Sequence, residues 1–420
     1  MSLSTLGLCP EILKALKERG YALATPIQKA LIPAILQGYD IVAGAQTGTG
    51  KTAGFTLPIL QELSKDVEES RENIKAIILV PTRELARQVH QNIESYGAYL
   101  SLNSMVLYGG SNMSAQAKRL KSGVDIVVAT PGRLLEHIGK KNISLDSVKY
   151  LVLDEADTIL DMGFVNEVMQ IVQRLPKKRQ TILVSATLLG SVKSLAQKIL
   201  HKPKLIEIDS MGTSAKNVEL VVLPVVKEKK MELLSYLIGW RNYQQVLVFV
   251  RKKQEANEVA DELNLSGLKT LVIHGDKSSA RRARALEAFK EGRVRVLVAT
   301  DIMARGLDIP SLDVVINFDI PHVTSDFLHR IGRTGRAGKR GLAITLVSPK
   351  EEIALKEVER LMGKAIKREE IEGYRPKVEN TQRGARKVAN QKRKVAGAFG
   401  RKKKSYNKKK RKTTKRDRWH

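Results

Sequence analysis

The sequence predicts an α/β protein with two parallel-sheet domains in tandem, followed by a disordered basic C-terminal tail. Short β-branched runs alternate with helical stretches through most of the chain, which is typical of parallel sheets covered by helices on both faces. The 420 residues exceed the size of one ordinary domain. The last 46 residues contain no Ile or Leu, so they cannot bury enough apolar surface to fold alone.

The alternating runs also place the domain boundaries. We expect an N-terminal domain over residues 1–208, a linker over 209–216, a second domain over 217–370 and the tail over 371–420. After helical spacing over residues 1–36, first-domain strands are expected at 41–43, 76–80, 104–108, 125–129, 150–153 and 180–184. Second-domain strands are expected at 245–250, 270–273, 295–299, 314–317 and 342–347, before a last helix over about 350–362. Because ligands bind where the C-terminal ends of parallel strands open into loops, the functional residues should share one sheet edge.

The net charge of +29 is concentrated in the tail. Residues 375–420 carry 20 Lys and Arg against two acidic residues, a net +18, which leaves +11 for residues 1–374. This charge indicates a densely negative partner, with nucleic acid the first candidate. We expect a sequence-independent nucleic-acid tether, in which Phe399, Tyr406 and Trp419 are available to stack on bases. A solvated solubility tail, or a nuclear import signal within residues 401–404 and 408–412, remains an alternative.

Several classes of protein are not expected from the composition. No apolar run approaches the roughly 18 residues of a membrane-spanning helix, so no membrane association is expected. The N-terminus has Glu11 early and lacks the basic-then-apolar layout of a signal peptide. Cys9 is the single cysteine, which suits a reducing compartment, and a cytoplasmic location is expected. The seven histidines are scattered, so no structural zinc site is expected.

The stretch from Asp40 to Thr52 has the composition of a phosphate-binding loop. Glycines let backbone N–H groups close on phosphate oxygens, the following helix adds the positive end of its dipole, and Lys51 adds a full charge. The Thr52 hydroxyl can hold Mg²⁺. Ala45 stands where the usual pattern has Gly, and the helix after the loop is expected to end at Pro58. The loop residues are Ala45, Gln46, Thr47, Gly48, Thr49, Gly50, Lys51 and Thr52.

Acidic residues follow the strand expected at 150–153, in the order Asp154-Glu155-Ala156-Asp157. An acid at a strand end opposite a phosphate loop is placed to bind Mg²⁺ through water, which is the role expected for Asp154. The neighbouring Glu155 can activate or orient an attacking water. Four such residues alone are a common solvated turn, but together with the phosphate loop they favour phosphoryl-transfer chemistry.

These motifs resemble the DEAD-box RNA helicases, a family named after the Asp-Glu-Ala-Asp run. The similarity extends from about Leu3 to Met362, with some ten motifs in the family's order and spacing. It implies two RecA-like domains that bind ATP and Mg²⁺ and hydrolyse ATP in response to RNA. It also implies local unwinding of RNA duplexes and remodelling of RNA or RNA–protein complexes by a monomer. Ribosome-assembly and RNA-decay complexes are possible partners, and the physiological RNA stays open.

The resemblance assigns further roles residue by residue. Gln28 would read the adenine edge, Tyr21 would stack on its face, Asp308 would lie at the ribose, and Arg333 and Arg336 would be arginine fingers on the γ-phosphate. Segments expected to contact RNA contain Pro81, Thr82, Arg83, Gly109, Gly110, Thr130, Pro131, Gly132, Arg133, Gly275 and Thr300. Residues expected to couple hydrolysis to strand separation are Asp157, Ser185, Thr187 and His329.

Two positions depart from the family pattern, and two rival functions stay open. Leu3 stands where the family usually has an isolated aromatic, and Ser279 stands where it often has Gln, although Arg282 is retained. The segment at residues 254–260 and the short basic tail look most like the bacterial RhlE-like branch. The rivals are a DNA helicase of the same superfamily and an RNA-binding or annealing factor with an accessory ATPase.

Overall fold

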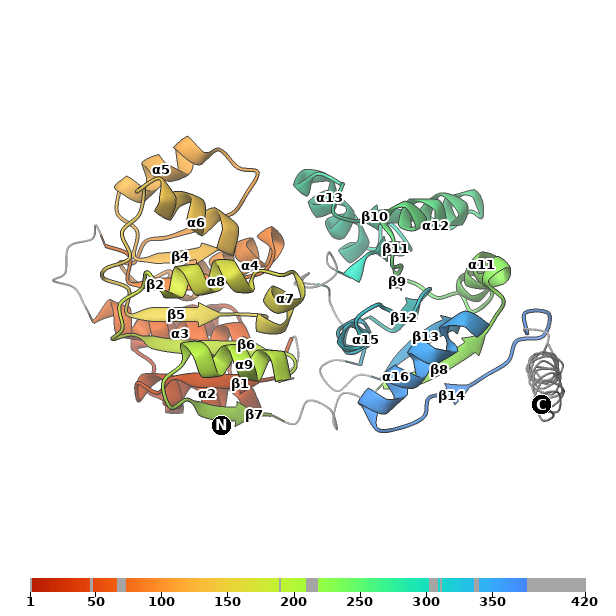
Figure 1. The fold of residues 1–420 in the computed structure, drawn as a ribbon, viewed down its shortest axis with the longest axis horizontal. Coiled ribbons are helices and arrows are strands. Elements are labelled where there is room, and N and C mark those ends of the chain that lie inside the picture. The colour runs from red at the N-terminus through yellow and green to blue at the C-terminus, as the bar shows by residue number, and fades with distance from the viewer. Residues whose placement is uncertain are drawn as a thin grey trace, which may run out of the picture. The chain divides into compact units, whose positions relative to one another are not determined.

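Two seven-stranded parallel sheets organise the chain (Figure 1). The computed structural model describes residues 2–45, 48–65, 73–188, 190–208, 218–301, 309, 312–335 and 340–375. We call residues 2–208 the first lobe and residues 218–375 the second lobe. The expected linker at 209–216 lies outside the described residues, as does the expected tail from residue 376 onward.

The first sheet has the strand order β3-β4-β2-β5-β6-β1-β7, and all neighbours are parallel. Its strands are β1 (Ile41–Gly44), β2 (Ala76–Leu79), β3 (Ser104–Leu107), β4 (Ile126–Ala129), β5 (Tyr150–Leu153), β6 (Gln180–Ser185) and β7 (Lys204–Glu207). The six strands expected in this lobe are therefore confirmed. The edge strand β7 was not predicted, because Ile206 is its only buried residue and the strand has no apolar run.

Helices cover both faces of this sheet (Figure 1). They are η1 (Leu3–Leu6), α1 (Pro10–Glu18), α2 (Pro26–Leu36), α3 (Lys51–Ser64), α4 (Arg83–Tyr96), α5 (Met113–Lys121), α6 (Pro131–Gly139), α7 (Ala156–Asp161), α8 (Val165–Val172) and α9 (Gly190–Ile199). The expected end of a helix at Pro58 is wrong, because α3 continues to Ser64. Pro58 removes one backbone donor, but Leu57, Ile59 and Leu60 on the same stretch are fully buried, and their packing outweighs that loss.

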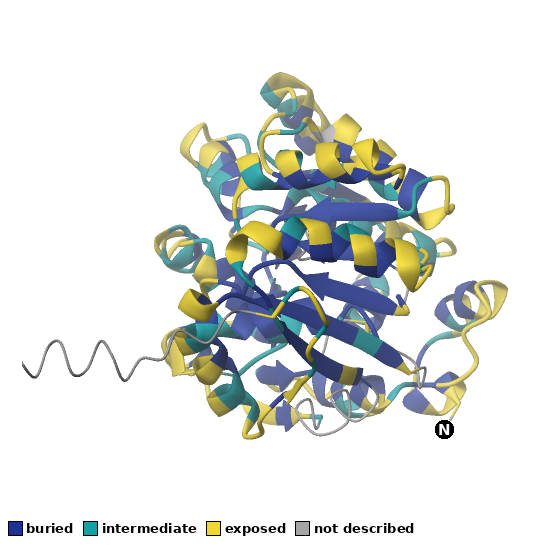
Figure 2. Ribbon diagram, turned by 90° about the vertical axis from the view of Figure 1, so that its right-hand side faces the viewer, coloured by how far each residue is buried: buried dark blue, intermediate teal, exposed yellow. Residues whose placement is uncertain are grey.

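Alternating strand residues feed two separate cores, one on each face of the first sheet. Ile41 and Ala43 pack with the residues of α1 to α4, whereas Val42 faces the core formed with α6 to α9. Figure 2 shows the strands buried and the outer faces of the helices exposed. Leu3 is only 4% exposed within the first of these cores, so a leucine side chain at this position can pack there without an aromatic ring, and its N–H also bonds the Ala22 carbonyl.

The second sheet has the strand order β10-β11-β9-β12-β13-β8-β14, again with parallel neighbours throughout. Its strands are β8 (Val218–Pro224), β9 (Val246–Phe249), β10 (Thr270–Ile273), β11 (Val296–Ala299), β12 (Val314–Asn317), β13 (Gly341–Val347) and β14 (Lys367–Arg368). The five expected strands are confirmed. The sequence analysis missed β8, although Leu220 to Leu223 form an apolar run directly after the expected linker. It also missed β14, which has two exposed residues and no pattern.

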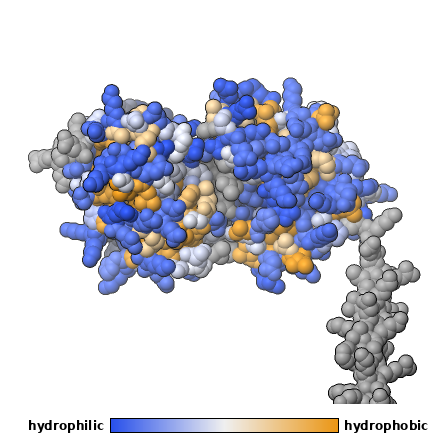
Figure 3. Space-filling model, turned by 45° about the horizontal axis from the view of Figure 1, so that its top comes forward, coloured by the Kyte–Doolittle hydropathy of each residue, from blue (hydrophilic) through white to orange (hydrophobic). Residues whose placement is uncertain are grey.

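The helices described in this lobe are η2 (Lys227–Lys229), α11 (Lys230–Trp240), α12 (Lys253–Leu265), α13 (Ser279–Lys290), α15 (Thr324–Ile331), η3 (Pro349–Glu351) and α16 (Glu352–Met362). The last two together occupy the expected final helix. Ile371 and Tyr374 pack against the core beside α11, so the ordered chain continues past residue 370, where the tail was expected to begin. Figure 3 shows a largely hydrophilic face with small hydrophobic patches. Within the described part of the chain, no helix has the length and apolarity to cross a membrane.

The two sheets have the same topology, position by position. Adding seven to each strand number of the first sheet gives the order of the second, so β8 corresponds to β1, β12 to β5 and β13 to β6. The chain therefore builds the same seven-stranded parallel layer twice.

Candidate active site

The phosphate loop connects β1 to α3, and its lysine is the first residue of that helix. Gly48 and Gly50 have φ of 85° and 91°, a backbone conformation that L side chains rarely adopt. Lys51 is 6% exposed, and its Nζ donates a hydrogen bond to the carbonyl of Ala45 at 2.6 Å. Gln46 and Thr47 lie outside the described residues. The lysine is thus held at the mouth of the loop, where a phosphate could replace the Ala45 carbonyl.

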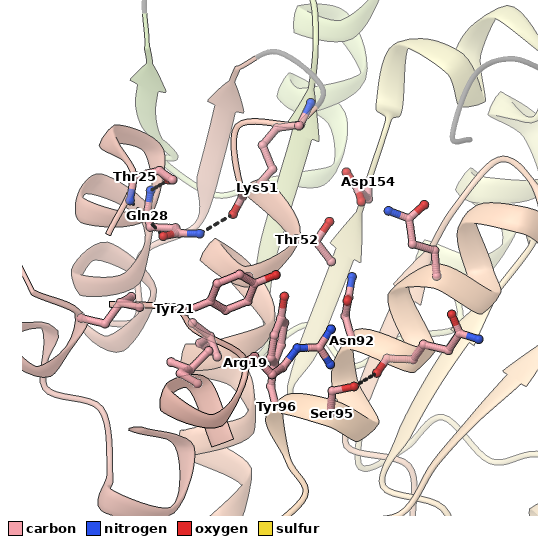
Figure 4. Close-up of a pocket in the computed structure, with 18 of the residues that line it drawn as sticks. Arg19, Tyr21, Thr25, Gln28, Lys51, Thr52, Asn92, Ser95, Tyr96 and Asp154 are labelled. Carbon is pink, nitrogen blue, oxygen red and sulfur yellow. Dashed lines mark hydrogen bonds between the residues drawn. The ribbon is translucent and has the colours of Figure 1, made fainter. Parts of the chain in front are cut away.

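A capping box at the start of α2 reaches the same loop. Gln28 Oε1 accepts a hydrogen bond from the Thr25 N–H at 3.0 Å, and Gln28 N–H donates to Thr25 Oγ1 at 3.5 Å. Gln28 Nε2 donates to the Gly50 carbonyl at 3.2 Å (Figure 4). A Cβ at residue 50 would lie 2.4 Å from that nitrogen, so the contact requires glycine. Gln28 therefore links the segment expected to read adenine directly to the phosphate loop.

A cavity of about 540 Å³ lies over this loop, within the range of sites for nucleotide-sized ligands. Tyr21 is 45% exposed at its wall, and its ring lies 6.2 Å from that of Tyr96 (Figure 4). The predicted site residues that line the cavity are Tyr21, Gln28, Gly48, Gly50, Lys51, Thr52, Asp154 and Glu155. Helix α4 adds Gln88, Gln91, Asn92, Ser95 and Tyr96, which the sequence analysis did not identify. Their helical spacing gave no signal that this helix faces the cavity.

The acidic pair after β5 has an unusual local geometry. Glu155 has φ 50° and ψ 52°, a left-handed conformation that is strained for a residue with a Cβ. Its N–H donates to Asp154 Oδ1 at 2.9 Å, and both side chains are buried. Glu155 Oε2 is buried with no hydrogen-bond partner among the described residues. A strained residue with an unsatisfied oxygen at a cavity wall points to a partner that arrives with the ligand.

The site has the donors that Mg²⁺ requires. Burial raises the pKa of Asp154 to about 7, and the charge of Lys51 acts in the opposite direction. A cation beside Asp154 would therefore stabilise its ionised form. Thr52 lines the same cavity. No cluster of three or more His, Cys, Asp or Glu side chains in the described ranges could hold a metal unaided. Thr52 and Asp154 therefore fit a Mg²⁺ whose other ligands come from phosphate and water.

Asp157 connects three motifs. Its Oδ2 accepts hydrogen bonds from Ala186 N–H at 3.1 Å and from Thr187 N–H at 2.9 Å and Oγ1–H at 3.1 Å. His329 Nε2, from α15 of the second lobe, lies 3.4 Å from the same oxygen. Ser185 Oγ donates to the Thr187 carbonyl at 2.7 Å. The four residues expected to couple hydrolysis to strand separation are therefore in one contact network.

The residues expected to contact RNA follow β2, β3 and β4 at the same sheet edge. Thr82 Oγ1 caps α4 by accepting the Leu85 N–H at 3.2 Å. Gly110 has φ 81°, and a Cβ there would lie 2.5 Å from Arg83 Nη1, so the guanidinium packs against the loop after β3. Arg133 Nη2 donates to the Ser111 carbonyl at 3.1 Å, which ties α6 to the same loop. Thr130, Pro131 and Gly132 form the start of α6, where backbone N–H groups can bind phosphate.

In the second lobe, the arginine that follows His329 holds α15 in place. Arg330 is 1% exposed and forms a bidentate ion pair with Asp301, with Nη2 to Oδ2 at 2.7 Å. Its Nη1 donates to the Asp319 carbonyl. The sequence analysis missed this anchor, because nothing in the spacing showed which arginine of the motif points inward.

The predicted finger Arg333 is buried, at 1% exposed, just after α15, and Arg336 and Asp308 lie outside the described residues. Thr300 and Gly275 follow β11 and β10 at the corresponding edge of the second sheet. A second contact between the lobes joins Arg282 Nη2 to Glu84 Oε1 at 2.6 Å. The retained Arg282 therefore pairs with the first lobe, whereas Ser279 is placed only as the first residue of α13.

Among the described residues, a phosphate loop with an acidic pair beside it on one RecA-like sheet, and Arg333 after a helix of the second, define an ATPase built from two such lobes. The DEAD/DEAH box helicase model matches residues 25–195, and the helicase conserved C-terminal domain matches residues 229–338. The chain belongs to the DEAD-box family of ATP-dependent RNA helicases.

Individual relatives agree with this assignment. The chain is 41% identical over 355 residues to the DEAD-box ATP-dependent RNA helicase CshA of Bacillus cereus, which covers 84% of this chain and 67% of that protein. It is similar to the structure of S. cerevisiae Dbp5 bound to RNA and ADP BeF3, with 30% identity, a TM-score of 0.78 and coverage of 93% and 99%. It is also similar to Mss116 bound to ssRNA and UDP-BeF, with 29% identity, a TM-score of 0.80 and coverage of 90% and 81%. The chain thus spans about two thirds of the length of the curated relative.

Proposed function

We propose that this helicase uses ATP hydrolysis to separate short RNA duplexes locally and to remodel RNA or RNA–protein complexes. The observation that carries the proposal is Asp157, which contacts the motif at Ser185–Thr187 in its own lobe and His329 in the other. A change in nucleotide state beside Asp154 and Glu155 can therefore reach the segments that would hold RNA. Loss of the γ-phosphate would loosen the lobes and release the strand.

The chemistry needs positioned charge more than covalent participation. Lys51 and the loop N–H groups would bind the phosphates, while Tyr21 and Gln28 hold the adenine. Glu155, with its free carboxylate oxygen, would orient the attacking water. Mg²⁺ held by Thr52 and Asp154 would neutralise charge on the β- and γ-phosphates. Arg333 and Arg336 would add positive charge from the second lobe, so that hydrolysis depends on both lobes.

The RNA would lie along the edge formed by Pro81–Arg83, Gly109–Gly110 and Thr130–Arg133, with Gly275 and Thr300 adding contacts from the second lobe. Helix N-termini and arginines at this edge bind phosphates without reading sequence. The two similar structures contain RNA or ssRNA, which supports RNA over DNA as the substrate.

Turnover assays on the full chain test the proposal. We expect ATP hydrolysis to be stimulated strongly by RNA and little by DNA of the same sequence, with ATP-dependent displacement of a short RNA strand. Equal stimulation by DNA would identify a DNA helicase. Annealing of RNA without multiple ATP turnovers would identify an annealing factor, a role that the basic tail favours. The protein Lys51→Ala, which lacks the phosphate-binding charge, is the control for contaminating ATPase.

Finer assignments stay predictions of the same proposal. We expect a cytoplasmic monomer acting in ribosome assembly or RNA decay. The segment at 254–260 and the short tail favour the RhlE-like branch, whereas the relative matched above is named CshA. Crosslinking of RNA to the protein in cells, followed by sequencing, would identify the substrate and decide between these branches by function.

A further inference from the structure

The second lobe contains a buried cluster of charges that the proposed ATPase chemistry does not use. Lys230, Asp319 and Glu351 are 2%, 4% and 8% exposed. Lys230 Nζ lies 2.6 Å from the Phe318 carbonyl, 3.3 Å from Asp319 Oδ1 and 2.7 Å from Glu351 Oε2. Fully buried lysines are rare unless they are paired, so this arrangement calls for an explanation.

The cluster lies at the position of the second sheet that corresponds to the phosphate site of the first. Strand β1 leads to α3, whose first residue is Lys51, and the equivalent strand β8 leads to α11, whose first residue is Lys230. Strand β5 is followed at once by Asp154, and the equivalent β12 is followed after one residue by Asp319. A lysine and an aspartate therefore occupy the same corner of both sheets.

Glu351 is bound as a phosphate oxygen would be. Its Oε2 accepts hydrogen bonds from Lys230 Nζ at 2.7 Å, Ser348 Oγ at 2.6 Å and Ser348 N–H at 3.0 Å. A lysine, a hydroxyl and a backbone N–H are the donor types that a phosphate loop offers. Glu351 Oε1 is buried with no hydrogen-bond partner among the described residues, and Arg251 Nη2 lies 3.7 Å from it.

Electrostatics agrees with this description of Glu351. Burial acts to raise the pKa of its carboxyl, but Lys230 and Ser348 outweigh burial and hold the pKa below its usual value. Arg251 and Asp319 complete the cluster, and the nearby Glu255 has its pKa raised by burial and by Asp319. Glu351 is also the nearer carboxylate, because Lys230 Nζ lies 2.7 Å from Glu351 Oε2 and 3.3 Å from Asp319 Oδ1.

We propose that this cluster is a degenerate phosphate site that the second lobe fills with its own carboxylate. Glu351 takes the place of an oxyanion, keeps Lys230 paired and closes the corner to nucleotides. The same cluster supports α15, because Asp319, whose side chain binds Lys230, accepts Arg330 through its backbone carbonyl. Removal of the Glu351 carboxylate should therefore create a site for a tetrahedral oxyanion such as sulfate or phosphate.

Anion rescue of stability tests this proposal in the full chain. Trp240, the last residue of α11, reports unfolding of the second lobe once the other tryptophan is removed by Trp419→Phe. In that background, Glu351→Ala should lower the Tm of the Trp240 signal by about 5 °C, because the buried Lys230 loses the nearer of its two carboxylate partners and keeps only Asp319 and the Phe318 carbonyl. Sodium sulfate should restore more of this Tm than sodium chloride at equal ionic strength. Since the first lobe can also bind sulfate, the measured quantity is the rise in Tm that sulfate causes in Glu351→Ala minus the rise that it causes in the Trp419→Phe parent.

Three further variants decide the outcome. Lys230→Met combined with Glu351→Ala should lose the extra sulfate response, and Glu352→Ala, which removes a surface ion pair with Arg368, should respond as the parent does. If Glu351→Ala does not fold, Glu351→Gln should fold with a lower Tm and no extra response, because the amide fills the site. The proposal is overturned by a sulfate gain in Glu351→Ala equal to the parent's, by persistence of that gain without Lys230, or by an unchanged Tm in Glu351→Gln.

Discussion

The two lobes share a strand order but differ in the connection that follows β1 in the first lobe and the equivalent strand β8 in the second. After β1 the chain has Gly48 and Gly50 in left-handed conformations, and Lys51 faces a cavity of about 540 Å³. After β8 the chain makes the short turn η2 without glycine, and Lys230 is closed in by Glu351. The shared fold delivers a lysine to the same corner twice. The first lobe has glycines in its loop and a cavity beside Lys51, whereas the second lobe places Glu351 against Lys230, and this difference decides which lysine can meet a ligand.

Each lobe has a capping box near its lysine, formed by Thr25 and Gln28 in the first lobe and by Ser348 and Glu351 in the second. The side chain of the third helical residue also makes a contact outside the box in each lobe. Gln28 caps Thr25 and also donates to the Gly50 carbonyl of the phosphate loop. Glu351 caps Ser348 and also accepts from Lys230. Gln28 is neutral and bonds the backbone of the phosphate loop, whereas Glu351 brings a negative charge directly to Lys230.

The largest effect on ATP hydrolysis should come from removing the positive charge of Arg333, which the second lobe would supply to the phosphates bound by the first. Arg333→Ala is expected to lower kcat for RNA-stimulated ATP hydrolysis about 1,000-fold, as is usual for arginine fingers, with little change in nucleotide affinity. Turnover assays and fluorescent-nucleotide titration measure the two quantities. Arg293→Ala removes an exposed arginine paired with Glu291 and serves as the control. Near-normal turnover in Arg333→Ala would contradict the role of Arg333 as an arginine finger.

Within the first lobe, Glu155→Gln should lower turnover about 100-fold or more, because the carboxylate that orients water is lost while the binding residues remain. ATP and RNA should then form a long-lived complex, measurable as slow RNA dissociation in the presence of ATP. The matched control is Glu62→Gln, which makes the same chemical change on the surface of α3. Normal turnover would contradict the assigned role of Glu155.

Removing the tail should affect neither lobe's chemistry. Residues 1–374 lack the +18 segment, so RNA affinity at low salt should fall roughly tenfold, and the slope of log affinity against log salt should flatten by about 0.7 for each phosphate that the tail would have bound. ATPase activity at saturating RNA should be nearly unchanged. An unchanged slope would exclude the tether, and lost ATPase would place the tail in the catalytic unit.

The smallest effect concerns the capping boxes themselves. Thr25→Ala should cost about 1 kcal/mol of the free energy of unfolding of the first lobe, the usual loss for an N-cap. Ser348→Ala should cost more in the second lobe, because it also removes one donor from the buried Glu351. Urea unfolding followed by far-ultraviolet circular dichroism compares the two. Equal losses would mean that the Ser348 hydroxyl acts only as a cap.

Much of this organisation could be predicted from the sequence, because β-branched runs mark buried parallel strands and their C-terminal ends must meet at one edge. The loop at Lys51 and the acids at 154–157 follow from such local patterns. The bond from Gln28 to Gly50 and the pair of Lys230 with Glu351 join residues far apart in sequence, so no local spacing contains them. The run Ser348-Pro-Lys-Glu351 does show a capping-box pattern in the sequence. The contact of Glu351 with Lys230 depends on the pairing of β13 with β8, which the pattern does not contain.

The strained backbone at Glu155 has a consequence for how this enzyme could be improved or damaged. Glycine would adopt φ 50° without strain and would remove a buried, unsatisfied carboxylate oxygen, so Glu155→Gly should make the first lobe more resistant to heat. Selection for heat resistance alone would then favour a protein that cannot turn over. A library of variants sorted by stability without an activity screen should therefore lose Glu155 early.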